Sequence, residues 1–216
     1  HVLVYKRDSQ TGVYKQLGNQ IFGDNALDQF GGAIALSDDG KILAVATNKV
    51  DGHSQGNIDY LRTYQYKEIL NTWEQIGQTL TFEGGGSLVD LKLDLNADGS
   101  ILAIGNPRIG FTDYGQGVAE VYQFDQNNNQ WNLLGDKFEG ELTYGLLGSS
   151  ISLNAVGDVI AISELLENSR YNKPGYVKIF KYNDISCVKI SRRVSKGLQQ
   201  GTAGAVFRAD TKVRSS

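Results

Sequence analysis

The amino-acid sequence predicts an all-β protein made of repeated four-stranded antiparallel units. Three observations support this prediction: a fixed spacing between matching residues, short alternating strands, and turns that depend on glycine. Matching residues recur every 58 or 59 positions along the 216-residue chain, namely the aromatic residues Tyr5, Tyr64, Tyr122 and Phe180 and the glycines Gly40, Gly99 and Gly157. A repeat of this length indicates a copied supersecondary unit, and each copy needs its neighbours to bury its apolar faces.

The first two strands of each unit form a predicted β-hairpin. In residues 30–47, FGGAIALSDDGKILAVAT, two apolar stretches flank Asp39 and Gly40. An Asp-Gly pair between apolar stretches is a strong hairpin signal, because the tight reversal needs a positive φ that glycine adopts without steric cost. Residues 95–105 and 153–163 repeat the pattern as LNADGSILAIG and LNAVGDVIAIS.

Two further strands complete each unit. An alternating strand ends in an aromatic residue, as in VAEVYQF (118–124), and the next strand carries an aromatic residue and a Leu-Gly or Ile-Gly pair, as in QWNLLG (130–135). Tyr14, Trp73 and Trp131 occupy the same position of the repeat. The side chains alternate with a period of two residues, and glycine interrupts the pattern often. Both features indicate short β-strands and not helices.

The hairpin strands carry one bulky and one small face. Ile34 and Leu36 alternate with Ala33 and Ala35, and the third copy keeps this alternation at residues 150–153, SISL. Because neither face is charged, we expect both to be covered by stacking of each sheet on a copy of itself, as the blades of a β-propeller do. The predicted fold is a partial β-propeller of about 3.5 four-stranded blades.

The predicted repeats fill residues 1–184. They comprise the outer strands of a first blade at 2–29 and successive blades at 30–88, 89–146 and 147–184. Residues 185–216 lose the repeat and carry seven Lys or Arg against Asp210 alone, so we expect a basic, poorly ordered tail. Closed propellers hold about four to eight blades. We therefore expect further blades or a second chain to cover the open ends.

Residues 28–47 resemble the FG-GAP repeat of integrin-α-like propellers. Asp28, Phe30 and Gly31 match its Asp-x-Phe-Gly box. The wider unit is similar to repeats of large algal, protist and bacterial proteins, and the resemblance covers residues 2–184. It implies a propeller fold at an extracellular or cell-surface location, and propellers of this kind serve adhesion, scaffolding and sometimes catalysis.

The sequence offers little for metal or cofactor chemistry. FG-GAP repeats often bind Ca²⁺ through a loop between their first two strands, but the tight turns predicted here are too short to surround a cation with about six to eight oxygens. The single cysteine, Cys187, excludes a cysteine metal site and an internal disulfide. We expect no metal and no cofactor.

Catalysis, nucleic-acid binding and membrane insertion are not predicted. The two histidines are His1 and His53, and no serine-hydrolase, zinc-protease or phosphate-loop motif is present. The basic residues after position 185 are sparse and lack interleaved aromatic residues, and the repeats hold more acidic than basic residues. No apolar stretch approaches the roughly 20 residues of a membrane-spanning helix.

Variable loops on one rim are the predicted binding site. The connections between second and third strands differ from copy to copy, and such loops on a regular scaffold commonly bind partners. The candidates for contacting a protein or glycan are His53, Arg108, Phe111, Tyr114, Arg170 and Tyr171. A second set replaces small residues with charges beside the central channel, where pairing, water or a ligand is required, and consists of Asp90, Lys92 and Asp94.

These observations predict a non-catalytic interaction or scaffold module that binds protein or glycan through its rim loops. Two alternatives remain at this point. The chain could be a fragment of a propeller enzyme whose active site lies partly in other blades, or a purely structural repeat element. Few histidines and no clustered acids weigh against catalysis within this segment.

Overall fold

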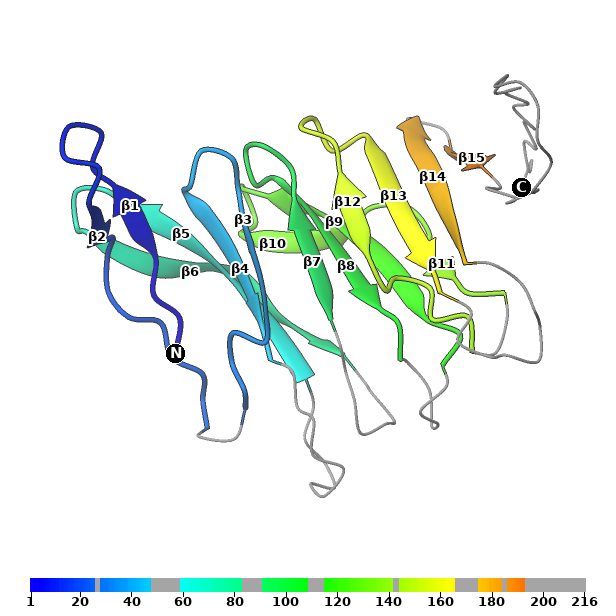
Figure 1. The fold of residues 1–216 in the computed structure, drawn as a ribbon, viewed down its shortest axis with the longest axis horizontal. Helices are drawn as coiled ribbons and strands as arrows, with labels where there is room; N and C mark the ends of the chain where they lie inside the picture. The colour runs from blue at the N-terminus through cyan, green and yellow to red at the C-terminus, as the bar shows by residue number, and fades with distance from the viewer. Residues whose placement is uncertain are drawn as a thin grey trace, which may run out of the picture.

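The computed structural model describes residues 1–25, 28–47, 59–82, 91–108, 115–141, 144–165, 175–183 and 186–192. Every regular element in these ranges is a β-strand, so the all-β prediction is confirmed (Figure 1). Within the same ranges we find no apolar helix of membrane-spanning length.

The strands form four antiparallel sheets, each of them continuous in sequence. The N-terminal pair consists of β1 (Tyr5–Arg7) and β2 (Tyr14–Gln16). Sheet I consists of β3 (Ala33–Leu36), β4 (Ile42–Ala46), β5 (Asp59–Lys67) and β6 (Thr72–Phe82). Sheet II consists of β7 (Lys92–Leu95), β8 (Ile101–Asn106), β9 (Val118–Asp125), β10 (Gln130–Leu133) and β11 (Phe138–Glu139). Sheet III consists of β12 (Ile151–Leu153), β13 (Val159–Glu164), β14 (Tyr176–Asn183) and β15 (Ser186–Arg192).

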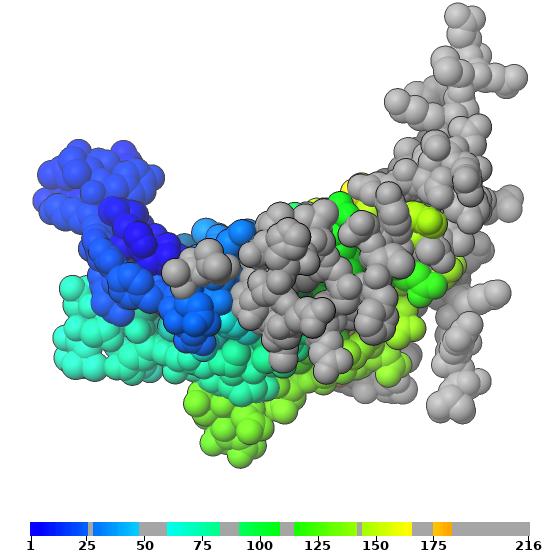
Figure 2. Space-filling model, turned by 90° about the horizontal axis from the view of Figure 1, so that it is seen from below, coloured from blue at the N-terminus to red at the C-terminus, as the bar shows by residue number. Residues whose placement is uncertain are grey.

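The sheets follow one another along the long axis of the molecule in chain order. Figure 1 shows β1 and β2 at one end, β14 and β15 at the other, and the turns of the β3–β4, β7–β8 and β12–β13 hairpins on the same side. Figure 2, seen from below, places the blue N-terminal residues at one end of this row. The tail expected after residue 184 begins as a strand, because β15 pairs with β14 from Val177 to Asn183.

Stacking of unlike faces forms the core between sheets I and II. Ala44, Ala46 and Leu61 of sheet I pack with Leu102 and Ile104 of sheet II in one buried cluster. Small residues on one sheet admit the bulky residues of the next, which gives the close packing typical of protein interiors. The same arrangement recurs between sheets II and III, where the cluster includes Ala103, Ala119, Ile151, Leu153 and Ile162.

One face departs from the expectation that both faces of each sheet are covered. Ile34 and Leu36 on β3 are 57% and 48% exposed, whereas Leu95, at the position of Leu36 in sheet II, is 6% exposed. The reason is that the N-terminal pair supplies only two strands. Val2 and Ile21 flank this pair, are joined by a β-bridge, and pack in one cluster with residues of β4, β5 and β6, which leaves β3 uncovered.

The hairpin turns connect successive sheets. Gly40, Gly99 and Gly157 all have positive φ, between 69° and 87°, as the sequence predicted. The amide of Asp38 donates to the carbonyl oxygen of Ala97 at 3.0 Å, and the amide of Ala97 donates to that of Ala155 at 3.0 Å. Turns of adjacent hairpins are thus joined at one repeat interval.

A tryptophan contact joins the outer strands of neighbouring sheets. A Cβ placed on Gly18 would lie 2.7 Å from Trp73 Cδ1, and one on Gly77 would lie 2.5 Å from Trp131 Cδ1. The indole rings of Trp73 and Trp131 each tilt at 47° against an aromatic residue of the preceding strand in their own sheet. The two tryptophans therefore occupy equivalent surroundings, as their spacing predicts.

Candidate functional site

A buried polar residue lies at the same end of the second strand in each of sheets I, II and III. Thr47 directly follows β4, Asn106 ends β8 and Glu164 ends β13, and they are 59 and 58 residues apart. All three side chains are at most 4% exposed. Because the rest of these strands is apolar, a buried hydroxyl, amide and carboxylate at this one position must each be stabilised locally or by a bound molecule. We call Thr47, Asn106 and Glu164 the strand-end row.

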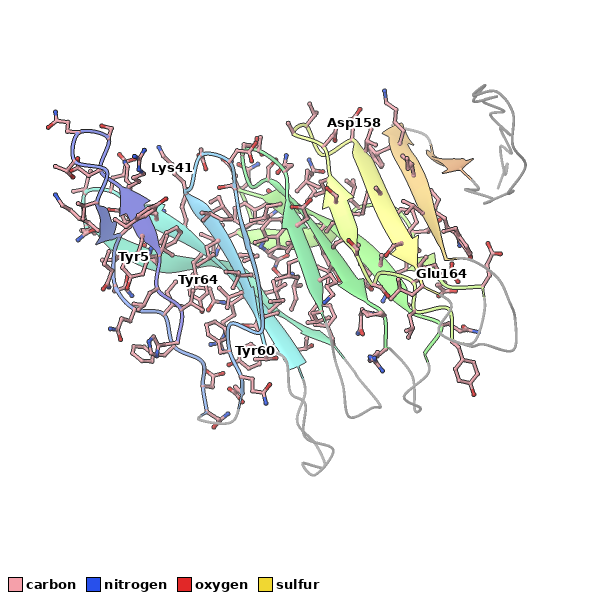
Figure 3. All side chains as sticks on the ribbon, in the orientation of Figure 1. Tyr5, Lys41, Tyr60, Tyr64, Asp158 and Glu164 are labelled. Carbon is pink, nitrogen blue, oxygen red and sulfur yellow. The ribbon has the colours of Figure 1, made fainter. Side chains whose placement is uncertain are left out.

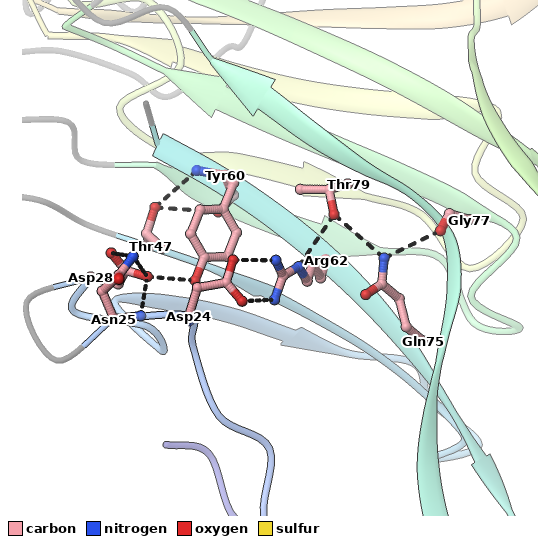
Figure 4. Close-up of polar contacts among 9 residues, drawn as sticks. All are labelled: Asp24, Asn25, Asp28, Thr47, Tyr60, Arg62, Gln75, Gly77 and Thr79. Atoms are coloured by element: carbon pink, nitrogen blue, oxygen red, sulfur yellow. Dashed lines mark hydrogen bonds and ion pairs between the residues drawn. The ribbon is translucent and has the colours of Figure 1, made fainter. Parts of the chain in front are cut away.

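The first member belongs to a fully connected hydrogen-bond network (Figure 4). The amide of Tyr60 donates to Thr47 Oγ1 at 2.9 Å, and the phenol of Tyr60 donates to Asp28 Oδ2 at 2.8 Å. The same carboxylate oxygen accepts from the amide of Asn25 at 2.9 Å. Asp28, the acid of the predicted Asp-x-Phe-Gly box, therefore fixes a local turn against β5.

A surface ion pair borders this network. Arg62 on β5 donates from Nη1 to Asp24 Oδ1 at 3.0 Å and from Nη2 to the second carboxylate oxygen. Its guanidinium carbon lies 4.6 Å from the centre of the Tyr60 ring. This two-point pairing holds the chain before β3 against sheet I.

The second member, Asn106, has no hydrogen-bond partner. Both its amide nitrogen and its amide oxygen are buried and unpaired. Its backbone lies close to Gly148, since a Cβ placed on that glycine would be 3.2 Å from the backbone nitrogen of Asn106. The amide of Gly148 in turn donates to the carbonyl oxygen of Ser163 at 2.9 Å, so the ends of β8 and β13 meet at this glycine.

The third member, Glu164, forms a buried ion pair. Lys178 Nζ on β14 lies 3.1 Å from Glu164 Oε2, with the two side chains 6% and 0% exposed. Lys178 also lies 3.6 Å from the exposed Glu141 and 5.1 Å from the centre of the Tyr176 ring. In Figure 3, Tyr60 and Glu164 lie below Lys41 and Asp158, away from the side that carries the hairpin turns. Burial, and then the neighbouring Glu164 carboxylate, hold the pKa of Tyr176 well above its usual value.

Charged residues also recur at one position of the third strand of each sheet, β5, β9 and β14. Arg62, Glu120 and Lys178 are equivalent, and each meets an opposite charge from a different element. Glu120 is 7% exposed and pairs with Lys137, while Tyr122 donates to its second oxygen at 2.9 Å. The strand ends therefore carry paired charges, and Asn106 stands among them without a partner.

Few of the predicted site residues fall within the described part of the chain. Arg108 lies half-buried just beyond β8, two residues after Asn106. Asp94 on β7 accepts the amide of Leu153 at 2.6 Å and so joins sheet II to β12 of sheet III, while Lys92 is half-buried on the same strand. The remaining candidates lie outside the described residues, namely His53, Asp90, Phe111, Tyr114, Arg170 and Tyr171.

The strand-end row was absent from the sequence prediction, although a signal was available. Aligning the repeats places Thr47, Asn106 and Glu164 in one register, directly after the strands ILAVA, ILAIG and VIAIS. A polar residue that recurs after apolar strands, yet changes its chemical type, is the pattern of a site on a regular scaffold. Among the described residues no group of three or more His, Cys, Asp or Glu side chains could hold a metal ion.

No protein-family model and no curated protein match the sequence. Solved structures do resemble the fold. A putative 6-phosphogluconolactonase from Bacteroides uniformis matches 85% of this chain with 14% identity and a TM-score of 0.51, and the chain covers 45% of that protein. A periplasmic gluconolactonase from Pseudomonas aeruginosa matches 83% of the chain with 14% identity and a TM-score of 0.44, over 46% of its own length. The chain thus spans about half the length of these two proteins, and at such identities the likeness is one of fold.

These neighbours correct the family prediction. The resemblance to FG-GAP repeats was wrong, because no family model matches the sequence and the fold resembles that of a putative 6-phosphogluconolactonase. The box residues that suggested it have another explanation here, since Asp28 accepts from Tyr60 and Asn25. Such a motif encodes local packing that stacked sheets of unrelated function can share.

The functional prediction is corrected by the same finding. The likeness in fold to a putative 6-phosphogluconolactonase contradicts the prediction of a non-catalytic adhesion or scaffold module, and with it the prediction that the protein is not an enzyme. The alternative, a fragment of a propeller enzyme, fits these neighbours better. The prediction rested on the absence of known catalytic motifs, and such an absence does not exclude an enzyme whose site is assembled from separate repeats.

The buried tyrosines predict loss of stability at alkaline pH. Burial raises the pKa of Tyr60 to about 12, and the neighbouring Asp28 carboxylate acts in the same direction. Because the folded pKa lies above the ordinary value of about 10, this stabilisation is complete below pH 10 and is lost as the pH rises toward 12. We expect urea unfolding to show a fall of roughly 2–3 kcal/mol across this window that Tyr60→Phe removes. The exposed Tyr14 provides the control, and an equal loss of the pH dependence in Tyr14→Phe would contradict the assignment.

Proposed function

We propose that this chain is part of a lactonase-type β-propeller enzyme that hydrolyses a sugar lactone. In this proposal sheets I to III are three four-stranded blades and the N-terminal pair is the outer half of another, about 3.5 in all. The repeats would occupy residues 1–184, with the segments 2–29, 30–88, 89–146 and 147–184 as successive blades. Support comes from the fold likeness to the Bacteroides uniformis protein over 85% of the chain.

Lactone hydrolysis has chemical requirements that the strand-end row could meet. Water must attack the ester carbonyl, a base must accept a proton from that water, and the carbonyl oxygen gains negative charge that needs a donor or a cation. Glu164 is the carboxylate at this end of the sheets, Lys178 is the cation and Asn106 is the neutral donor. In this proposal Asn106 donates to the carbonyl oxygen of the lactone, and Glu164, held by Lys178, accepts a proton from the attacking water. That proton passes to the ring oxygen when its bond to the carbonyl carbon breaks.

The unpaired amide of Asn106 is the observation that carries the proposal. A buried amide without a partner costs roughly 1–3 kcal/mol of stability. Thr47 in the same row accepts the amide of Tyr60, and Glu164 has Lys178 as an ion-pair partner, although neither of its carboxylate oxygens accepts a hydrogen bond. The protein provides no hydrogen-bond partner for the amide nitrogen or the amide oxygen of Asn106. A polar molecule bound at this end of the sheets would form hydrogen bonds with both atoms.

The loop residues predicted from the sequence keep a place in this proposal. Arg108 follows Asn106 by two residues and would contact the polar groups of the sugar. His53, Phe111, Tyr114, Arg170 and Tyr171 lie on connections that leave the same strand ends, and they remain predicted contacts. Asp90, Lys92 and Asp94 remain candidates for the channel.

The test is a comparison of Asn106→Leu with Asn132→Leu in a pH-stat assay of lactone opening. The substrates are glucono-δ-lactone and 6-phosphogluconolactone, with the spontaneous rate subtracted. We expect the unaltered chain to hydrolyse one of them, Asn106→Leu to lower kcat by about 100-fold, and the exposed Asn132→Leu to leave it unchanged. Because the leucine removes an unpaired buried amide, stability should be equal or higher, so a loss of activity cannot be ascribed to unfolding. Hydrolysis at the buffer rate, or equal activity of the two variants, would overturn the proposal.

A further inference from the structure

The unpaired polar atoms at the ends of β8 and β13 are mostly hydrogen-bond acceptors. In the part of the chain that the structure describes, the buried side-chain atoms without a hydrogen-bond partner belong to Asn106, Ser163 and Glu164. Side chains alternate along a strand, so Ser163 points to the face of sheet III opposite Glu164. Of the other four atoms, the Asn106 amide nitrogen is a donor, and the Asn106 amide oxygen and both carboxylate oxygens of Glu164 are acceptors. A molecule that satisfies these four atoms must offer them more donors than acceptors.

The ends of these two strands lie close together. The amide of Gly148 donates to the carbonyl oxygen of Ser163 at 2.9 Å, and a Cβ on Gly148 would lie 3.2 Å from the backbone nitrogen of Asn106. A Cβ on Gly105 would in turn lie 2.3 Å from the carbonyl oxygen of Gly148, so the backbones are in contact. One residue therefore separates the end of β8 from the end of β13, and a single molecule of the size of a sugar ring can reach both unpaired side chains.

Sheet I shows how a buried carboxylate with a structural role is satisfied at this end. The Oδ2 atom of Asp28 accepts from the phenol of Tyr60 at 2.8 Å and from the amide of Asn25 at 2.9 Å. Gly145 takes the place of Asp28 in the repeat that forms sheet III. The buried carboxylate of sheet III is instead Glu164 on the second strand, and it accepts no hydrogen bond from the protein. Its capacity to accept hydrogen bonds is therefore left for a bound molecule.

The positive charges at this end are already engaged with carboxylates. The pairs are Arg62 with Asp24, Lys137 with Glu120, and Lys178 with both Glu164 and Glu141. Lys92 and Arg108 also interact with neighbouring groups. A phosphate monoester carries a charge of about −1.5 to −2 at pH 7, and its oxygens are strong acceptors. Such a group would have to draw a cation away from a carboxylate and would place further acceptors beside atoms that need donors.

We propose that this site binds an uncharged sugar lactone in preference to its phosphorylated form. The inference rests on the proposed lactonase function and narrows its substrate class. Each hydroxyl of a neutral sugar can donate one hydrogen bond. Two hydroxyls would donate to the amide oxygen of Asn106 and to the Glu164 oxygen that does not take the proton of the attacking water. The lactone carbonyl would accept from the amide nitrogen of Asn106, so all four unpaired atoms would have partners.

Calorimetric binding of two matched lactams tests the proposal without turnover. In D-glucono-δ-lactam an N–H group replaces the ring oxygen, so the ring keeps its carbonyl and hydroxyl groups and resists hydrolysis. We expect the full chain to bind this lactam about tenfold or more tightly than the 6-phosphate of the same lactam. In the pH-stat assay, kcat/KM for glucono-δ-lactone should exceed that for 6-phosphogluconolactone by about the same factor.

Two variants connect this preference to the named side chains. Glu164→Gln removes the charge and replaces one acceptor with a donor, so lactam affinity should fall about tenfold and the preference over the 6-phosphate should shrink. Asn106→Leu should lower lactam affinity by a similar factor in a protein that remains folded. Glu139→Gln is the control, because it removes an exposed carboxylate that lies opposite the first residue of β9 at the same end. It should leave both affinities unchanged.

The possible results separate this inference from the proposed function. Lactam binding with the expected preference, but no hydrolysis of either lactone, would overturn the proposed function and support the neutral-sugar site. Hydrolysis accompanied by equal or tighter binding of the 6-phosphate would overturn the inference and leave the lactonase function standing. Absence of lactam binding, or the same loss of affinity in Glu139→Gln as in Glu164→Gln, would also overturn the inference.

Discussion

Replacing Lys178 with methionine is expected to lower the free energy of unfolding by about 3–5 kcal/mol. Lys178 Nζ lies 3.1 Å from Glu164 Oε2, and the Glu164 side chain is fully buried. Without the ammonium group this carboxylate stays buried with no opposite charge beside it. Breaking a buried pair is costly for that reason, even where the intact pair adds little to stability.

Urea denaturation of two further variants separates this explanation from simple loss of packing. Lys181→Met removes a lysine from the same strand whose partner, Asp158, lies 3.6 Å away at the surface, and we expect a change below about 1 kcal/mol. The double variant Lys178→Met with Glu164→Gln removes both charges and should recover most of the lost stability. If Lys178→Met is no worse than Lys181→Met, or if the double variant is worse than either single one, the buried pair does not have the assigned role.

Much of the fold could be predicted because residue types at fixed positions of the sequence reveal the repeat. The glycine of each hairpin turn is visible as a residue type, and Gly40, Gly99 and Gly157 adopt the positive φ that the turns require. Alternation of small and bulky residues predicted which faces meet, and Ala33 and Ala35 lie in the interface with sheet II. The exposure of Ile34 could not be predicted from alternation, because it depends on how many strands the preceding unit supplies.

The candidate site was harder to predict because its contacts cross between strands and sheets. The Glu164–Lys178 pair depends on the register of β13 against β14, in which Lys178 lies opposite Ile162 and two positions from Glu164. The pairing of Asp24 with Arg62 joins residues 38 apart. No spacing in the sequence encodes such a contact. Recurrence of a polar residue at Thr47, Asn106 and Glu164 was visible, but its burial was not.

The family prediction failed for a different physical reason. The Asp-x-Phe-Gly box at Asp28 describes how a chain turns into its first strand, where Asp28 accepts from Tyr60. That requirement is the same for any stacked four-stranded sheet, so the box identifies an architecture and carries no information on chemistry. Candidate site residues such as Asn106 are recognised only in the structure, where the hydrogen-bond partners of each buried side chain are known.

Gly77→Ala is expected to destabilise the protein by about 3 kcal/mol, against about 1 kcal/mol for Gly135→Ala. The two glycines are equivalent in the repeat and have φ of 67° and 75°, so an alanine meets the same backbone strain at both. The difference lies in the next sheet. A Cβ on Gly77 would lie 2.5 Å from Trp131 Cδ1, whereas one on Gly135 would meet nothing within 4 Å.

The pair of variants therefore measures the tryptophan contact between sheets with the backbone effect cancelled. Trp131 is buried, and its indole nitrogen donates to Thr63 Oγ1 at 2.7 Å in sheet I. The ring cannot move away from a new methyl group without breaking this hydrogen bond. In thermal and urea unfolding we expect Gly77→Ala to be the less stable variant by about 2 kcal/mol and to show a red-shifted tryptophan emission. Equal stability of the two variants would mean that sheet II does not press Trp131 onto Gly77, and the stacking of outer strands would have to be redrawn.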